Sequence, residues 1–337
     1  MDWFERLTGF RENAYDETCR QLEVEGNQLH SLVNGKSYGI GELELVSLQT
    51  LRERVNSGGG LPGRLKVSVV TGDVRKLHQS PEYNGALFQV ASQFNLLEMV
   101  SPTVTPEQGV TRYQHDSTQG PACAIAAGAA TIYRNYFAPV AGGHGQTSER
   151  QFDGLADLGN ILSQAVGLTV EALWSMSNGY ALCTSDGLNA ISEYLGALAP
   201  KEIDVLSGKL RIGVHSDVEV TDAQGPGRPH VSQVFCSALP IAYSSVSGAH
   251  WKAFASLILQ AAYNATMLAA VLNAQRGASK IVLLTRLGGG AFGNDDDWIH
   301  AAMRRALQTV EGFDLDVKLV SYGSPSHAML QMVEDFG

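Results

Sequence analysis

Apolar and polar positions follow two different periods along this chain, and the period changes from one segment to the next. The runs rich in β-branched and apolar residues, which predict strands, are residues 65–70, 86–91, 210–214, 231–235, 281–285 and 316–320. The stretches with apolar residues at helical spacing, which predict helices, are residues 121–136, 149–166, 188–198, 252–275 and 295–310. Because strands alternate with helices, the pattern predicts an α/β protein with a largely parallel or mixed sheet.

The first part of the chain has a different pattern, that of an N-terminal extension. A short helix is expected at residues 15–19, and strand-like pieces follow between residues 23 and 48. The stretch Ser-Gly-Gly-Gly-Leu-Pro-Gly at residues 57–63 is the clearest linker in the sequence. We therefore predict that residues 1–60 form an extension packed on the core and that residues 61–337 form the main, catalytic domain.

The composition is that of a compact, acidic protein. Charged residues make up 17% of the chain, below the usual ~25%, and 36 of the 337 residues are glycine. Sparse charge with abundant glycine fits an α/β enzyme with close backbone approaches and argues against disorder. The 24 basic and 34 acidic residues leave a formal net charge of −10, and the sequence has no cluster of Lys and Arg. We therefore expect no nucleic-acid partner.

The four cysteines are far apart and form no Cys-x-x-Cys pair; they are Cys19, Cys123, Cys183 and Cys236. This spacing is typical of reduced thiols and disfavours a disulfide framework or a zinc site. The N-terminus carries charges and has no apolar run, so we expect no signal peptide. Residues 251–272 are apolar but interrupted by polar side chains, which favours a buried helix over a membrane span. We expect a soluble cytoplasmic protein with no membrane partner.

The strongest local signal is a glycine-rich loop between the strand at 281–285 and the helix at 295–310. Residues 287–294 read Leu-Gly-Gly-Gly-Ala-Phe-Gly-Asn. Backbone N–H groups of such a loop, with the following helix N-terminus, can hold a diphosphate, and glycines let the anion approach the backbone. The loop lacks the Gly-Lys-Ser/Thr of a Walker motif. By spacing alone, a flexible turn ahead of a helix capped by Asp295 explains it equally well.

The order of these elements resembles that of macrodomains. A strand runs into Gly-Asp-Val at residues 72–74, a second strand ends before Asn95, and a late strand runs into the glycine-rich loop. The Gly-Ala-Phe-Gly ending of that loop resembles the poly(ADP-ribose) glycohydrolase branch. The resemblance covers about residues 65–322 and implies a macrodomain-like mixed sheet sandwiched between helices, with helical insertions.

The middle of the chain departs from the glycohydrolase pattern. Residues 109–121 and 142–146 do not match its Gly-Gly-Gly and Gln-Glu-Glu motifs. They are closer to divergent macrodomain hydrolases, known from bacterial effectors, that remove ADP-ribose from arginine. The chain therefore resembles that group most, which implies a hydrolase of arginine-linked ADP-ribose.

The resemblance also implies which residues bind ADP-ribose. Asp73 would accept the adenine amino group, Asn95 would lie near the terminal ribose, and Phe292 would pack on the distal ribose. By residue type alone, Asp73 and Asn95 also suit turns, and Phe292 also suits a core. The complete set of expected ligand-binding residues is Asp73, Val74, Asn95, Gly288, Gly289, Gly290, Ala291, Phe292, Gly293 and Asn294.

Candidate catalytic residues lie where the first phosphate loop of a macrodomain is replaced by a polar stretch at residues 105–120. This stretch holds Glu107 and Asp116, and Glu98 lies just ahead of it. Cleavage of an N-glycosidic bond passes through an oxocarbenium-like state, which needs a carboxylate to activate water or offset positive charge. We expect Asp116 and Glu107, and after them Glu98, to converge there without a metal. For each acid singly, the alternative is a solvated loop charge.

The resemblance therefore implies an ADP-ribosyl hydrolase with no cofactor. Its partners would be ADP-ribose and an ADP-ribosylated protein, in the cytoplasm or in a host cytosol if the protein is an effector. Two alternatives stay open: an ADP-ribose reader without activity, and a hydrolase of nucleotides or NAD. Release of free ADP-ribose, or consumption of NAD, would separate the three.

Overall fold

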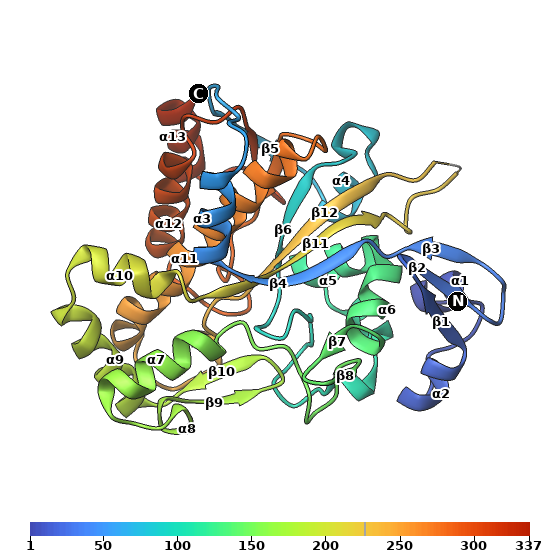
Figure 1. Cartoon of the computed structure of the whole chain (residues 1–337), viewed down its shortest axis with the longest axis horizontal. Coiled ribbons are helices and arrows are strands. Elements are labelled where there is room, and N and C mark those ends of the chain that lie inside the picture. Colours follow the sequence, from blue (N-terminus) through green and yellow to red (C-terminus); the bar gives the residue numbers. More distant parts are fainter. Residues whose placement is uncertain (226) are drawn as a thin grey trace.

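The computed structural model describes every residue of the chain except residue 226 (Figure 1). The seven strands of its main sheet are β4 (Glu42–Ser47), β5 (Lys66–Thr71), β6 (Leu87–Ala91), β11 (Arg211–Glu219), β12 (His230–Cys236), β13 (Ile281–Leu284) and β14 (Asp316–Ser321). Their order across the sheet is β4-β11-β12-β6-β13-β14-β5. The last five are parallel, whereas β11 pairs antiparallel with β12 and β4. The predicted α/β class with a mixed sheet is confirmed.

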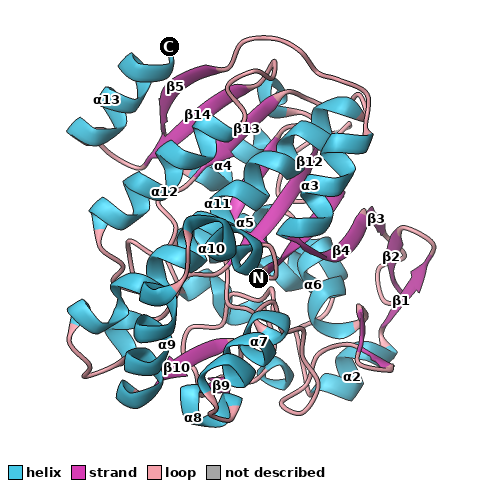
Figure 2. Ribbon diagram, turned by 60° about the vertical axis from the view of Figure 1, so that its left-hand side comes forward, coloured by secondary structure: helices cyan, strands magenta, loops and turns pink. Residues whose placement is uncertain are grey.

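Helices cover both faces of this sheet (Figure 2). One face carries α3 (Leu48–Ser57), α11 (Gly248–Gln275), α12 (Asp296–Thr309) and α13 (His327–Phe336), and the other carries α4 (Val74–Gln79), α5 (Gln119–Ala126) and α6 (Gly128–Tyr136). Side chains of β6 alternate between the faces, because Leu87 packs in the core with α11 and Phe88 packs in the core with α4 and α5.

The remaining elements lie outside the main sheet and the helices just named. They are α1 (Trp3–Thr8), α2 (Tyr15–Arg20), β1 (Leu22–Glu25), β2 (Gln28–Ser31), β3 (Ser37–Gly39), β7 (Pro139–Val140), β8 (Gly143–His144), α7 (Ala156–Val166), α8 (Val170–Leu173), β9 (Trp174–Ser177), β10 (Tyr180–Cys183), α9 (Ser185–Ala197), α10 (Pro200–Ser207), and the 3₁₀ helices η1 (Pro81–Tyr83), η2 (Pro106–Gln108), η3 (Thr111–His115) and η4 (Ile241–Tyr243). Strands β1 to β3 form a separate antiparallel sheet, and β9 and β10 form a hairpin.

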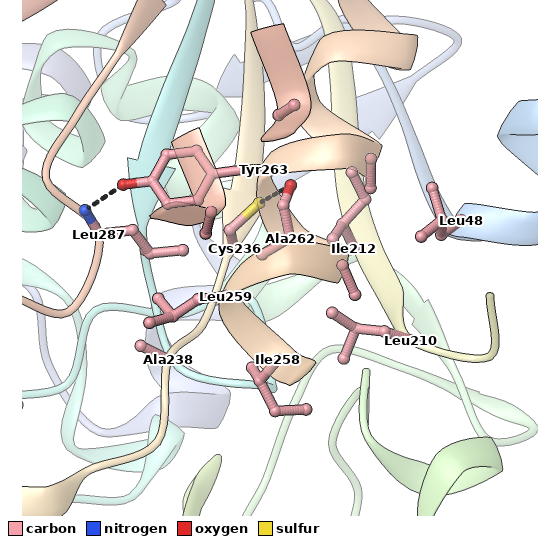
Figure 3. Close-up of a cluster of buried hydrophobic side chains, with 14 of the residues drawn as sticks. Leu48, Leu210, Ile212, Cys236, Ala238, Ile258, Leu259, Ala262, Tyr263 and Leu287 are labelled. Carbon is pink, nitrogen blue, oxygen red and sulfur yellow. Dashed lines mark hydrogen bonds between the residues drawn. The ribbon is translucent and has the colours of Figure 1, made fainter. Parts of the chain in front are cut away.

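Helix α11 is the centre of the larger core. It is long and apolar enough to cross a membrane, yet 83% of its most apolar window is buried inside the protein. Ile258, Leu259 and Tyr263 pack against the sheet, and the thiol of Cys236 on β12 lies 3.8 Å from the carbonyl oxygen of Ala262 (Figure 3). The predicted buried helix is confirmed, and its apolar character all round follows from its position between the sheet and other helices.

Part of the predicted extension at residues 1–60 belongs to the main sheet and its core. Strand β4 is the edge strand of the main sheet, and Leu48 and Leu51 of α3 belong to the core around α11. The residues up to the end of β3 pack in a second core together with η3, α5 and α6. The stretch at residues 57–63 therefore connects α3 to β5 within one fold and does not separate two domains.

Two predicted helices also differ in extent. The helix expected at 149–166 begins at Ala156, because the turn at Gly154 is bonded to β11: its carbonyl oxygen accepts a hydrogen bond of 3.0 Å from the Arg211 N–H. The helix expected at 121–136 is two helices, α5 and α6, with a break at Ala127. At Gly128 a side chain would press on the ring of Trp3, so α6 begins in close contact with the N-terminal segment.

Candidate active site

The carboxyl ends of the five parallel strands meet at one edge of the sheet, where α/β proteins commonly bind ligands. Strands β6 and β13 pair only through Leu87 and Phe88 and then separate. The side chain of Gln119 bonds to the freed backbone of β6: its amide nitrogen donates to the carbonyl oxygen of Gln89 at 2.8 Å, and its oxygen accepts from the Ala91 N–H at 2.9 Å. Gln119 thus holds the start of α5 at the point where the two strands diverge.

The N-terminus of α5 opens onto this edge. Its N-cap residue, Thr118, makes no side-chain capping bond, and the N–H groups of Gln119 and Gly120 have no acceptor in the described part of the chain. Gly120 approaches β6 so closely that any Cβ would overlap the carbonyl oxygen of Ala91. Free N–H groups at a helix N-terminus favour an anion, so this end of α5 is chemically suited to one.

The glycine-rich loop lies beside it, between β13 and α12. Among the residues that the structure describes, the N–H groups of Gly290, Ala291 and Phe292 have no acceptor. The loop is fixed at its C-terminal end, because the Asn294 side chain donates to the carbonyl oxygen of Leu239 at 2.8 Å. Three successive free N–H groups are the geometry expected of the predicted anion cradle.

The start of this loop is fixed by the core helix. The Tyr263 hydroxyl of α11 accepts from the Leu287 N–H at 2.9 Å and donates to the carbonyl oxygen of Thr285 at 2.6 Å (Figure 3). Gly288 has a φ of +74° and lies where a Cβ would overlap that of Ala238. The glycine there is therefore required by the backbone itself. Asp295 caps α12 through the N–H of Asp297, so the alternative interpretation of the loop as a capped turn also holds.

An aromatic cluster closes one end of the loop. The ring centroid of Tyr180, on β10, lies 5.3 Å from that of Phe292 and 5.2 Å from that of Tyr243. The Tyr180 hydroxyl donates to the carbonyl oxygen of Met99 at 2.6 Å, whereas Tyr243 is 40% exposed. The cluster is anchored on its Tyr180 side and open to solvent on its Tyr243 side.

Asp116 lies just ahead of the N-terminus of α5. It follows η3 directly, and its carboxylate accepts from the Thr118 N–H at 2.8 Å. Burial, then Tyr243, then the negative charge of Asp116 raise the pKa of Tyr180. The structure thus places Asp116 at the start of α5 and Phe292 in the aromatic cluster at the end of the glycine-rich loop.

Glu98 is buried beneath the start of α5, where a Cβ on Gly120 would lie 3.1 Å from its Cγ. It is 2% exposed, and both its oxygens lie 3.3–3.4 Å from the guanidinium of Arg134, which is fully buried. Burial raises the pKa of Glu98, although the charge of Arg134 opposes this. The carboxylate is thus enclosed and paired in this structure, and its expected catalytic role remains a prediction.

Glu107 is hydrogen-bonded to a later loop. One of its oxygens accepts from the Ser148 N–H at 2.8 Å and from the Ser148 hydroxyl at 3.0 Å. Burial raises the pKa of Glu107, but hydrogen bonds from Ser148, from its own backbone and from Thr105 outweigh burial and leave the pKa below its usual value. The expected convergence of Glu107 with Asp116 remains a prediction.

Asn95 is a turn residue inside the protein. It is fully buried, its nitrogen donates to the Gln151 side chain at 2.9 Å, and its oxygen accepts from the Leu97 N–H at 3.1 Å. Both polar atoms thus have partners within the protein, and the expected contact with ribose remains a prediction. The alternative interpretation as a turn former is the one that the geometry supports.

Asp73 caps helix α4, where one carboxylate oxygen accepts from the Arg75 N–H at 2.9 Å. Its other oxygen has no partner among the described residues, and the side chain is half-buried at the end of β5. The side chain of Val74 is buried in the core beneath. The role of Asp73 in binding adenine remains a prediction that this position permits.

Tyr322 was not predicted from the sequence. It is 86% exposed and directly follows β14, whose neighbours in the sheet are β13 and β5. It therefore extends from the edge between the glycine-rich loop and Asp73. No local pattern marks it, because an aromatic residue after a strand is common; only the strand order shows what lies on either side.

Comparisons with known proteins give structural neighbours only. No protein-family model and no curated protein matches the chain. Poly(ADP-ribose) glycohydrolase from Deinococcus radiodurans in complex with ADP-ribose shares 12% identity at a TM-score of 0.44, over 87% of this chain and 93% of that one. The enzyme from Thermomonospora curvata shares 12% identity at a TM-score of 0.36, over 94% of each chain. At these values the likeness assigns no role to any residue of this chain.

Proposed function

We propose that this chain is an ADP-ribosyl hydrolase of the macrodomain type, which cleaves the bond between the distal ribose of ADP-ribose and an arginine side chain of a protein. The observation that carries the proposal is the glycine-rich loop, in which three successive N–H groups have no acceptor among the described residues; Phe292 packs on Tyr180 at its end, and Asp116 precedes the N-terminus of α5 at the same edge of the sheet. A carboxylate beside an anion cradle suits a ligand with a diphosphate next to a reacting sugar.

The proposed ligand lies along the edge of the sheet. Asp73 follows β5 and Asp116 lies beyond the end of β6, three strands away in the sheet order. Three spacings of ~4.8 Å make about 14 Å, which requires an elongated ligand. Adenine would lie between Asp73 and Tyr322, the diphosphate between the glycine-rich loop and the N-terminus of α5, and the distal ribose against Phe292.

Arginine as the linked side chain suits a site that relies on a single acid, Asp116. An arginine guanidinium remains protonated at neutral pH, so its nitrogen leaves the anomeric carbon as neutral guanidine without a prior proton from the enzyme. The guanidine then takes the proton that the attacking water loses. Asp116 would orient that water and offset the charge of the ribosyl cation. A second catalytic carboxylate is not needed for this leaving group.

The test is release of free ADP-ribose from a protein that is mono-ADP-ribosylated on arginine, with the same protein modified on glutamate as a comparison. We expect release from the arginine-linked substrate. Binding of ADP-ribose without release would indicate a reader and contradict the proposal. Consumption of NAD without action on modified protein would indicate the third class, a nucleotide hydrolase.

Replacement of Asp73 tests the adenine end of the site. Asp73→Asn keeps a side chain that can cap α4 but removes the charge that would accept the adenine amino group, so we expect ADP-ribose binding to weaken about 10-fold with little change in stability. Asp73→Ala should also cost about 1 kcal/mol of unfolding free energy, because the cap is lost. Calorimetry with ADP-ribose and thermal unfolding measure the two effects. Unchanged affinity in Asp73→Asn would remove Asp73 from the site.

A further inference from the structure

The N-terminal segment contacts the loop that carries Asp116, and Glu12 is the side chain that accepts from the backbone of this loop. This residue lies between α1 and α2, and its two carboxylate oxygens accept hydrogen bonds from successive backbone N–H groups, Val110 at 2.8 Å and Thr111 at 2.7 Å. The hydroxyl of Tyr136, on α6, donates to the same carboxylate at 2.7 Å. All of the donors to Glu12 thus come from parts of the chain about 100 residues away.

The backbone around these bonds is shaped to fit the carboxylate. Gly109 has a φ of +81°, and a Cβ at this position would overlap Glu12. Val110 is fully buried, and the carbonyl oxygen of Thr111 accepts from the indole N–H of Trp3 at 3.2 Å. Residues 109–111 are therefore held by the N-terminal segment in two ways. The N–H groups of Val110 and Thr111 donate to Glu12, and the carbonyl oxygen of Thr111 accepts from Trp3.

This anchored segment leads directly to the proposed catalytic acid. Thr111 begins the 3₁₀ helix η3, which ends at His115, and Asp116 is the next residue. A 3₁₀ helix of five residues is short and rigid, so the position of its first N–H groups determines the position of the residue that follows it. A carboxylate at the start of η3 also complements the partial positive charge there.

We propose that Glu12 is a positioning residue for Asp116: it fixes the start of η3 and thereby the position of the carboxylate ahead of α5. This inference rests on the proposed hydrolase function. In the absence of the Glu12 charge, the N–H groups of Val110 and Thr111 lose their shared acceptor, and η3 shifts or loosens. A displacement of about 1 Å at a reacting group is enough to reduce a rate by ~100-fold.

The test compares Glu12→Gln with Glu17→Gln in the full chain. The glutamine at residue 12 keeps one acceptor but turns an NH₂ group toward a backbone N–H. We expect its kcat for release of ADP-ribose to fall at least 10-fold, while the Kd for ADP-ribose changes less than 3-fold, because the anion cradle and Asp73 do not contact Glu12. Glu17 is exposed on α2 of the same segment, so its variant should keep wild-type values.

A second readout does not depend on activity. In Glu12→Gln, the amide hydrogens of Val110 and Thr111 should exchange with solvent at least 10-fold faster, because their protecting acceptor is weakened. Tyr136→Phe keeps both N–H bonds to Glu12, so it should leave exchange at these two amides slow and lower kcat less than 3-fold.

The outcomes separate this inference from the proposed function. If the wild type releases ADP-ribose and Glu12→Gln keeps its kcat, Glu12 is structural and only the positioning role is overturned, whatever happens to the melting temperature. If kcat falls and Kd rises by the same factor, the whole site has been disturbed and the positioning role is again overturned. If the wild type binds ADP-ribose but never releases it from protein, the hydrolase function fails first, and the positioning role fails with it.

Discussion

Asp116→Asn is expected to lower the turnover number for release of ADP-ribose by about 100-fold or more, the usual effect of removing a positioned acid or base. Asparagine has nearly the same shape and keeps the oxygen that accepts from the Thr118 N–H, so the turn after η3 should persist. The charge that offsets the ribosyl cation is lost. Affinity for ADP-ribose should change far less, since the contacts of adenine and diphosphate lie elsewhere. Steady-state kinetics and calorimetry measure the two quantities.

The matched control for this substitution is Asp186→Asn. Asp186 is exposed in the first turn of α9, so its variant should behave as the wild type. Equal losses of affinity and turnover in Asp116→Asn would mean that Asp116 supports the structure of the site. Unchanged turnover would exclude it from catalysis; because Glu98 is enclosed by Arg134 and Glu107 is bonded to Ser148, the reader class would then be favoured.

Gly290→Glu should abolish measurable binding of ADP-ribose. A Cβ at residue 290 meets no atom within 4 Å, and the backbone there is not left-handed, so the variant should fold normally. Its carboxylate would lie beside the free N–H groups of residues 290–292, where the diphosphate is proposed to bind. Contact between like charges costs several kcal/mol, and ~3 kcal/mol corresponds to an affinity loss of about 100-fold.

Two variants control for the added charge and for the backbone. Gly312→Glu adds the same side chain at another open, exposed glycine, in the turn between α12 and β14 at the opposite edge of the sheet, and should bind as the wild type does. Gly290→Ala adds only a methyl group and should weaken binding less than 10-fold. If folded Gly290→Glu binds normally in calorimetry, the glycine-rich loop does not hold the phosphates.

The parallel core and its glycine-rich loop could be predicted because both are local patterns. Strand β13, the loop and helix α12 follow one another within 30 residues, and the change from apolar run to glycines to helical period is visible in the sequence. The place of β4 could not be predicted in this way. Alternation indicates a half-buried strand but not its partner, and the partner of β4 is β11, about 170 residues later.

The surroundings of the candidate acids could not be predicted from the sequence either. Glu98, Glu107 and Asp116 are all carboxylates in one polar stretch, and residue type does not distinguish them. Glu98 is enclosed by an arginine 36 residues later, and Glu107 is bonded to a serine 41 residues later. The side-chain nitrogen of Asn95 likewise donates a hydrogen bond to a glutamine 56 residues later. Only the distant partner decides whether a polar side chain faces a ligand or the interior.

The place of β4 and α3 also has a consequence for shortened forms of this protein. A chain that starts after the glycine-rich stretch at residues 57–63 looks from the sequence like a clean domain. It would leave the outer edge of β11, a strand of nine residues, without a hydrogen-bonding neighbour, and would uncover the apolar surface of α11 that Leu48 and Leu51 shield. Open strand edges beside apolar surface recruit other chains, so such a fragment would aggregate where the whole protein does not.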